Sequence, residues 1–165
     1  MDELIEHVKS HKLFSVKSLH RDDLPMLCAV ANGASDCTLV IEEAQAMAPQ
    51  SSENLPEALE DVIYRGRHYN TTLVMVAQRA STIHIAARSQ WRRLLVFGQS
   101  EDRDLSWLAG QTRLDEDEIY ALPPLYGYDC RRWKRNVLFS LTFRGDRVII
   151  DPVSSHEVPS TPEGV

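Results

Sequence analysis

Apolar residues along the chain gather in short runs separated by amphipathic segments. Residues 37–41 and 71–78 are nearly continuous apolar or β-branched runs, and 93–99 repeats this pattern before a polar residue. Continuous apolarity is typical of parallel strands buried on both faces. Residues 55–68 and 81–93, which lie between these runs, have the apolar spacing of helices. Strands alternating with helices predict an α/β fold with a mostly parallel sheet and flanking helices.

Further elements are expected around this alternation. They are helices at 2–9, 24–30, 100–110 and 114–122, a strand at 12–16, and a C-terminal β-hairpin at 136–151. Gly33 and Gly110 are expected to end the helices in which they occur. We therefore expect residues 1–152 to form one α/β domain. We expect the segment 153–165, which contains Ser, Thr and Pro, to be a disordered tail.

Composition narrows the class of protein. The chain has 165 residues, 43% hydrophobic and 25% charged, which is ordinary for a globular domain that buries a core. No apolar run approaches the ~20 residues that a membrane span needs. The N-terminus lacks the basic start and apolar core of a secretory signal, so a cytoplasmic location is expected. The three cysteines form no C-x-x-C pair, which argues against a disulfide framework and a structural zinc site.

Charge is distributed unevenly along a chain whose net charge is −6. Acidic residues dominate the first 61 positions, and arginines gather from Arg65 onward. The densest basic cluster consists of Arg131, Arg132, Trp133, Lys134 and Arg135. Cations around an aromatic ring can pair with phosphates and stack on a base, so this cluster is a candidate nucleic-acid site. The alternative is a solvated basic turn before a strand.

Polar side chains follow three of the expected strands. Glu42 and Glu43 come after the first, Gln78 after the second and Gln99 after the third. In open α/β sheets, ligands bind outside the carboxyl ends of the strands. Phosphoryl transfer needs a carboxylate for Mg²⁺, a second carboxylate for the attacking water, and a polar group near the terminal phosphate. The alternative is that Glu42 merely begins a surface helix, because the residues after it favour helices.

Three stretches together resemble a known family. "TLVIEEAQAMAP", "YRGRHYNTTLVMVAQRAS" and "RSQWRRLLVFGQSEDRDLSWL" are similar to the Walker B, fourth-strand and fifth-strand segments of the FtsK/HerA superfamily of DNA-pumping P-loop ATPases. The resemblance covers roughly residues 12 to 110. It implies a partial P-loop NTPase core of the RecA-like ASCE type, with ATP and Mg²⁺ as cofactors.

The resemblance also implies roles for individual residues. Glu42 would serve the magnesium and contribute to nucleotide binding, although the family usually has Asp there and the longer side chain moves the carboxylate by about 1.5 Å. Glu43 would be the catalytic base, and Gln78 would be the sensor that contacts the γ-phosphate and water. Such ATPases work as rings, usually hexamers, in which an arginine reaches the neighbouring subunit's nucleotide. The candidates for that arginine finger are Arg65, Arg67, Arg79 and Arg88.

One family motif is absent from the chain. G-x-x-x-x-G-K-[ST], the Walker A loop that cradles the phosphates, does not occur, and none of the four lysines follows a glycine loop. The resemblance implies that the strand preceding this loop would lie between the strand that ends at Gln78 and the strand at 93–99. Without it, these two strands either pair with each other or leave open edges, which invite another chain. We therefore expect self-association, or a partner that supplies the Walker A segment.

Three hypotheses follow from the sequence. The first is an ATP-dependent DNA translocase or helicase-type motor module of the FtsK/HerA class, with DNA as partner and without autonomous ATPase activity unless a Walker A loop is supplied. The second is a non-catalytic DNA- or protein-binding remnant of such an ATPase. The third is an unrelated α/β domain whose Glu42-Glu43 pair only starts a helix. ATP-dependent activity separates the first from the second.

Overall fold

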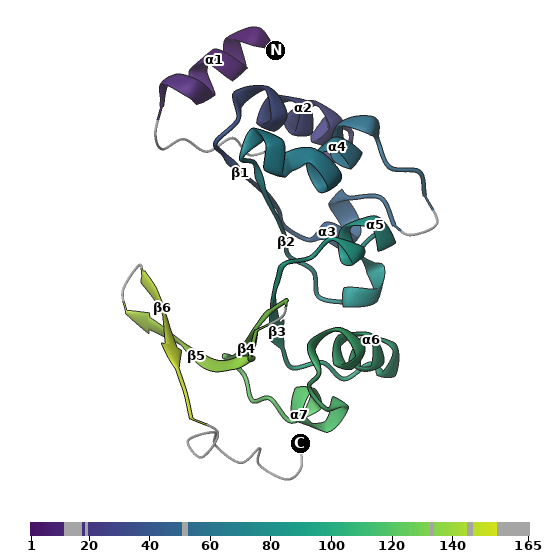
Figure 1. Cartoon of the computed structure of the whole chain (residues 1–165), viewed down its shortest axis with the longest axis vertical. Coiled ribbons are helices and arrows are strands. Elements are labelled where there is room, and N and C mark those ends of the chain that lie inside the picture. Colours follow the sequence, from purple (N-terminus) through teal and green to yellow (C-terminus); the bar gives the residue numbers. More distant parts are fainter. Residues whose placement is uncertain (12–17, 19, 51–52, 133, 145–146, 155–165) are drawn as a thin grey trace. The chain divides into compact units, whose positions relative to one another are not determined.

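The computed structural model describes residues 1–11, 18, 20–50, 53–132, 134–144 and 147–154. The chain divides into two compact units, Met1–Gln90 and Trp91–Val165 (Figure 1). The strand predicted at 12–16 lies outside the described residues, as do all but the first two residues of the predicted tail. The predictions of one domain over 1–152 and of a disordered tail stay predictions.

The first unit contains a parallel strand pair with helices packed against it. Its elements are α1 (Asp2–Ser10), η1 (Arg21–Asp23), α2 (Leu24–Ala34), β1 (Thr38–Ile41), α3 (Ala44–Met47), α4 (Glu57–Arg65), η2 (Gly66–Tyr69), β2 (Thr72–Met75), η3 (Ala80–Thr82) and α5 (Ile85–Ser89). β1 and β2 pair in parallel, with Thr38 opposite Thr72 and Ile41 opposite Met75. The predicted α/β class, with a parallel sheet and flanking helices, is confirmed.

The core of this unit lies on one face of the strand pair, where α2 and α4 pack (Figure 1). Cys28 of α2 and Leu59 of α4 are at most 1% exposed and cluster with Ile41. The other face is open: Val40, Val74 and Val76 are 53%, 39% and 51% exposed. The expectation that these strands are buried on both faces is therefore wrong for the described residues, because α2 and α4 both pack on the same face of the strand pair.

Two helices differ from their predicted bounds. α2 continues through Gly33 to Ala34, and Gly33 lies close against α1, since a Cβ there would lie 2.8 Å from Ile5 Cδ1. The helix predicted at 81–93 is only α5, which starts after a tight turn at η3. In that turn the Thr82 hydroxyl donates to the Arg79 carbonyl at 2.7 Å, and His84 Nδ1 then accepts from the Ala86 amide at 3.2 Å.

The second unit is an antiparallel sheet with helices. Its elements are β3 (Arg93–Phe97), α6 (Asp102–Thr112), α7 (Glu116–Tyr120), β4 (Tyr126–Arg131), β5 (Val137–Arg144) and β6 (Arg147–Pro152), and the strand order is β3-β4-β5-β6. The predicted C-terminal hairpin is confirmed by the pairing of β5 with β6. β4 was not predicted from the sequence. α6 continues past Gly110 to Thr112, and Arg113, whose φ is 64°, caps it.

Candidate phosphate site and basic sheet end

β1 delivers two carboxylates to the carboxyl edge of the parallel pair. Ile41 is 4% exposed and anchors the strand in the core, whereas Glu42 and Glu43 directly after it are exposed. Glu43 adopts a left-handed conformation, with φ 48° and ψ 50°, and α3 begins at the next residue. Both interpretations of this segment, a strand that ends at two acids and a helix that begins there, therefore apply: β1 ends just before Glu42, and α3 starts just after Glu43. A left-handed non-glycine residue is uncommon and often marks a functional turn.

Backbone hydrogen bonds extend the pairing beyond the last strand residues. The Val76 amide donates to the Ile41 carbonyl at 2.9 Å, and the Ala44 amide donates to the Val76 carbonyl at 2.8 Å. The turn that carries both carboxylates is therefore tied to the segment that follows β2. Gln78 is exposed two residues farther along that segment. The structure thus brings Glu42, Glu43 and Gln78 to one edge of the first unit.

These three side chains are available for a ligand. Within the described part of the chain, no hydrogen bond or ion pair involves the side chain of Glu42, Glu43 or Gln78, and Glu43 does not cap α3 with its side chain. Mg²⁺ prefers one or two carboxylates together with water and substrate phosphates over an all-protein cage. The described residues hold no group of three or more His, Cys, Asp or Glu that could bind a metal alone. The donor set fits a magnesium ion that is bound together with a nucleotide.

The four arginines proposed as fingers occupy different environments in the first unit. Arg65 ends α4 and pairs with Asp61 at 3.0 Å, although its side chain remains 67% exposed. Arg67 is exposed in η2, and Arg79 is exposed directly after Gln78. Arg88 lies half-buried in α5. An exposed ion pair such as that of Arg65 is worth at most ~1 kcal/mol, so it does not prevent Arg65 from turning to another partner.

Gln99, the third polar residue predicted at a strand end, lies in the second unit. It follows β3 and lines an open hollow with Phe97, Tyr120 and Tyr126. Gly98, beside it, fits closely under the following loop, because a Cβ there would lie 2.9 Å from the Leu122 carbonyl oxygen. Gln99 therefore lies in a hollow of the second unit that is lined by aromatic side chains, and not at the strand edge that carries the two acids.

The predicted basic cluster begins at the end of β4. Arg131 is the last strand residue, and Arg132, Lys134 and Arg135 are exposed in the turn that follows, while Trp133 lies outside the described residues. The Lys134 amide donates to the Arg131 carbonyl at 2.9 Å, and the Arg132 amide donates to the Arg92 carbonyl at 3.1 Å. This turn is thereby joined to the start of β3, which brings Arg92 and Arg93 to the same sheet end. The sequence gives no sign that these two arginines join the cluster, because β4 is not predicted from it.

Burial limits the reactivity of two of the three cysteines. Cys28 is fully buried and Cys130 is 1% exposed. Burial raises the pKa of each thiol to about 12. Since the thiolate is the reactive form, neither residue is suited to be a nucleophile. All three cysteines are free thiols, which agrees with the absence of a disulfide framework.

Comparison of the chain with known protein families identifies one family. The family model of zonular occludens toxin (Zot) matches residues 3–94, which is more than half of the chain. No curated protein is similar enough in sequence to count as a match. None of the described helices is both long and apolar enough to cross a membrane.

Solved structures are similar to the chain in fold. The genome packaging NTPase B204 of Sulfolobus turreted icosahedral virus 2, in complex with ATP-gammaS, superposes with a TM-score of 0.70 at 15% identity, covering 81% of this chain and 69% of that one. The DNA-packaging ATPase B204 of Sulfolobus turreted icosahedral virus gives a TM-score of 0.65 at 15% identity, covering 81% and 68%. The chain thus shares the fold of these P-loop NTPases.

Proposed function

Because the chain belongs to the zonular occludens toxin (Zot) family, and because its fold is that of a P-loop NTPase, we propose that it is the Walker B and sensor part of an ATP-driven DNA motor of the FtsK/HerA class. The observation that carries this proposal is the position of Glu42, Glu43 and Gln78 at the same sheet edge, where each follows one of two paired parallel strands. Packing alone does not account for three exposed, uncommitted polar side chains at the position where such folds bind ligands.

Each of these residues has a distinct task in the proposed reaction. Glu42 would hold a magnesium ion, directly or through water, and the bound ion would supply charge neutralisation during phosphoryl transfer. Glu43 orients the attacking water and accepts its proton. The Gln78 amide, which can donate and accept, contacts that water and the terminal phosphate. The backbone bond between Ala44 and Val76 fixes the acids relative to the amide, so catalysis here is mainly positioning.

The phosphate cradle must come from a segment that the sequence does not contain. β2 pairs with β1 and with no other described strand, so its second edge is open. Next to this edge lies the exposed apolar face of Val40, Val74 and Val76. An open edge beside exposed valines suits an added strand, because backbone bonds and apolar burial both favour it. We propose that the chain segment that carries the Walker A loop, or a second copy of this chain, docks there.

The proposed motor is a ring, usually a hexamer in this class, that acts on DNA. In such a ring an arginine of one subunit completes the nucleotide site of the next. Arg67 is the most suitable of the four candidates, because its side chain is exposed and no hydrogen bond or ion pair to it occurs among the described residues. Arg65 would first have to leave Asp61.

Nuclear magnetic resonance with Mn-ATP as a paramagnetic probe tests the nucleotide site, since it detects weak binding residue by residue. We expect the amide signals of Ala44 and Gln78 to broaden first as Mn-ATP is added. The double variant E42Q/E43Q should abolish this broadening, whereas Glu57→Gln, an exposed acid on α4, should not. Broadening elsewhere, or broadening unchanged in the double variant, would refute the assignment of the site.

The absence of a Walker A loop from the sequence favours a second, non-catalytic function. The chain can also serve as a non-catalytic DNA- or protein-binding remnant, since without a Walker A loop most ground-state nucleotide binding is lost. Light scattering and ATPase assays of the chain with its natural partner segment separate the two functions. Turnover that depends on Glu43 supports the motor, and binding without turnover supports the remnant.

A further inference from the structure

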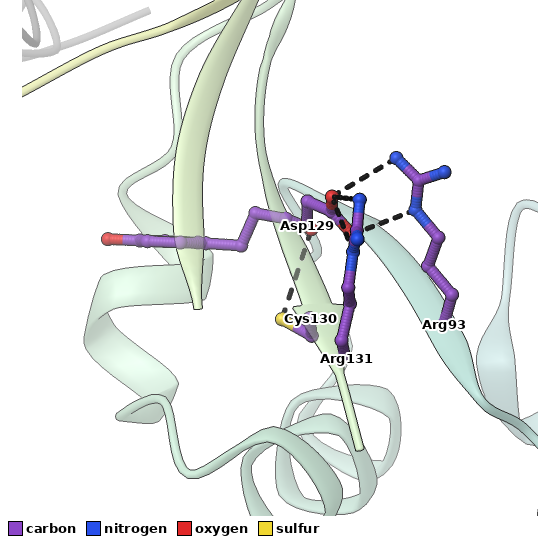
Figure 2. Close-up of polar contacts among 5 residues, drawn as sticks. Arg93, Asp129, Cys130 and Arg131 are labelled. Carbon is purple, nitrogen blue, oxygen red and sulfur yellow. Dashed lines mark hydrogen bonds and ion pairs between the residues drawn. The ribbon is translucent and has the colours of Figure 1, made fainter. Parts of the chain in front are cut away.

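The basic sheet end of the second unit contains a pair of arginines that are held by one acid. Arg93 of β3 and Arg131 of β4 are direct cross-strand partners. Figure 2 shows both guanidinium groups converging on the carboxylate of Asp129. Arg93 donates from Nε at 2.9 Å and from Nη2 at 3.1 Å, and Arg131 donates from Nε at 3.3 Å and from Nη2 at 3.1 Å.

This arrangement leaves positive charge exposed in fixed positions. The Asp129 side chain is only 14% exposed, whereas those of Arg93 and Arg131 are 52% and 49% exposed. Burial alone would raise the pKa of Asp129, but the hydrogen bonds and charges of the two arginines outweigh burial and lower it. One carboxylate therefore meets two guanidinium groups, and each retains N–H groups that Asp129 does not use.

Other cations surround the pair. Arg92, Arg132, Lys134 and Arg135 are all exposed at the same sheet end, although the whole chain carries a net charge of −6. The Arg132 guanidinium lies 5.4 Å from the centroid of the Trp91 ring, whose Nε1 donates to Gln111 at 3.2 Å. The acids of the second unit lie mostly in the first turns of α6 and α7. Six cations of this unit thus gather at one sheet end, which is the electrostatic footprint of a polyanion site.

Apolar side chains continue from the pair along the same sheet face. Leu95 and Phe97 follow Arg93 at two-residue steps, so their side chains project from the same face. They are 45% and 38% exposed. The Phe97 ring is held edge-on against Phe139, with centroids 5.7 Å apart, and is therefore a fixed aromatic surface. Cations at one end of a strand, with an exposed aromatic ring farther along the same face, suit single-stranded nucleic acid, because phosphates pair with the cations and bases stack on the ring.

We propose that this sheet end binds the phosphodiester backbone of single-stranded DNA. Arg93 and Arg131 are the phosphate-binding residues, and Asp129 is a positioning residue that fixes their guanidinium groups. The pair lies at the amino end of β3, whereas nucleotides in such folds bind at the carboxyl ends of strands, which favours a polynucleotide over ATP at this place. The inference rests on the DNA-binding part of the proposed function and adds the site and its chemistry.

Fluorescence anisotropy of a labelled oligothymidylate, titrated with the whole chain over a range of salt concentrations, tests the site. The variant R93Q/D129N/R131Q removes both guanidinium groups without leaving a carboxylate unpaired, so its net charge falls by one. Arg144→Gln on β5 changes the net charge by the same amount at an exposed position of the same unit. We expect the triple variant to bind at least about tenfold more weakly, with a salt slope smaller by about 1.4, and Arg144→Gln to bind normally.

Several outcomes would overturn the proposal. Equal losses in both variants would mean that only the overall field matters. Displacement of the oligonucleotide by polyglutamate as readily as by unlabelled DNA would identify an acidic peptide as the ligand, and displacement by Mg-ATP would identify a nucleotide. Folding of each variant is checked by circular dichroism. A chain that binds Mn-ATP at Glu42 and Glu43 but no DNA would contradict this inference and the DNA-binding part of the proposed function, and would leave the nucleotide site standing. A chain that binds DNA but no Mn-ATP would contradict only the nucleotide site.

Asp129 needs a test of its own. Removing its charge by Asp129→Asn favours anion binding electrostatically, but it also releases the two guanidinium groups. We expect weaker binding of the oligonucleotide by Asp129→Asn and partial recovery in Asp129→Glu, which restores a carboxylate. Tighter binding by Asp129→Asn would overturn the positioning role.

Discussion

Replacing Gly127 by alanine should loosen the antiparallel sheet on which the Arg93–Asp129–Arg131 cluster depends. Gly127 lies on β4 opposite Phe97 of β3 and Phe139 of β5. A Cβ at this position would lie 2.7 Å from the Val96 carbonyl oxygen and 2.8 Å from the Phe139 ring carbon Cζ. Gly127 does not have a positive φ, so the cost of the substitution is steric rather than conformational.

The stability cost of Gly127→Ala follows from the atoms that the added Cβ would displace. The Val96 oxygen is backbone next to the β3–β4 pairing, and Phe139 is 2% exposed in the core, so neither can move away without disturbing the sheet. Overpacking of this kind costs about 1–3 kcal/mol, and we expect the upper end of that range. At 1.4 kcal/mol for each factor of ten, opening of the second unit becomes about a hundredfold more frequent.

Thiol labelling measures this opening directly. Cys130 is 1% exposed, and burial raises its pKa to about 12, so reagent reaches it only when the sheet opens. In a Cys37→Ser background, peptide mass spectrometry follows Cys130 and Cys28 separately. We expect Gly127→Ala to speed the labelling of Cys130 about a hundredfold and to leave Cys28, in the first unit, unchanged.

Gly110→Ala is the matched control. Gly110 is inside α6, and a Cβ there meets nothing within 4 Å. Alanine in a helix interior is favoured over glycine by about 0.5–1 kcal/mol, so labelling of Cys130 should become slower. The reasoning is refuted if Gly127→Ala leaves Cys130 protected, or if both substitutions shift its labelling in the same direction.

Further predictions concern reactivity, chemistry, pH and assembly. In the unmodified chain, Cys37 should react with iodoacetamide in the folded state while Cys28 and Cys130 resist; modification of all three at one rate would contradict their burial. Glu43→Gln should retain nucleotide binding, measured by calorimetry, and lose turnover in the assembled enzyme; equal loss of both would make the residue structural. The pKa of Asp129 is lower in the folded state than in the unfolded state. The stability that Asp129 contributes is therefore present above the unfolded pKa near 4 and is lost as the pH falls through the folded-state pKa. In acid titrations monitored by Tyr and Trp fluorescence, the stability of Asp129→Asn should depend less on pH than that of the unmodified chain; an unchanged dependence would contradict this contribution. Light scattering should show association of the isolated chain; a monodisperse monomer would count against docking at the open edge of β2.

Local patterns located most of the elements that build the phosphate site. The apolar runs predicted β1, β2 and β3, and the polar residues after β1 and β2 identified Glu42, Glu43 and Gln78. Such runs are readable because the β-branched and apolar side chains themselves favour strands. The helix at 81–93 was overestimated because the Arg79–Thr82 turn is stabilised by side-chain bonding that a periodicity count does not detect.

The basic cluster shows the limit of such reading. Arg131, Arg132, Lys134 and Arg135 stand out in the sequence, but Arg93 and Asp129 join them only through pairing between strands that are far apart in the chain. β4 was missed because Tyr126-Gly-Tyr-Asp-Cys-Arg131 is mixed in polarity and contains a glycine, which is weak in strands. Its identity as a strand depends on Gly127 fitting against Val96 and Phe139, a contact that no local pattern encodes.

The sequence by itself determined the α/β class, the positions of β1, β2 and β3 along the chain, and the chemical types at the ends of β1 and β2, because these follow from interactions between neighbours in the chain. Tertiary structure alone decided that the face of Val40, Val74 and Val76 is open, that Ala44 is bonded to Val76, and that Arg93 and Arg131 share Asp129. Each of these depends on register and packing between distant segments, which hydrophobic pattern constrains only in part.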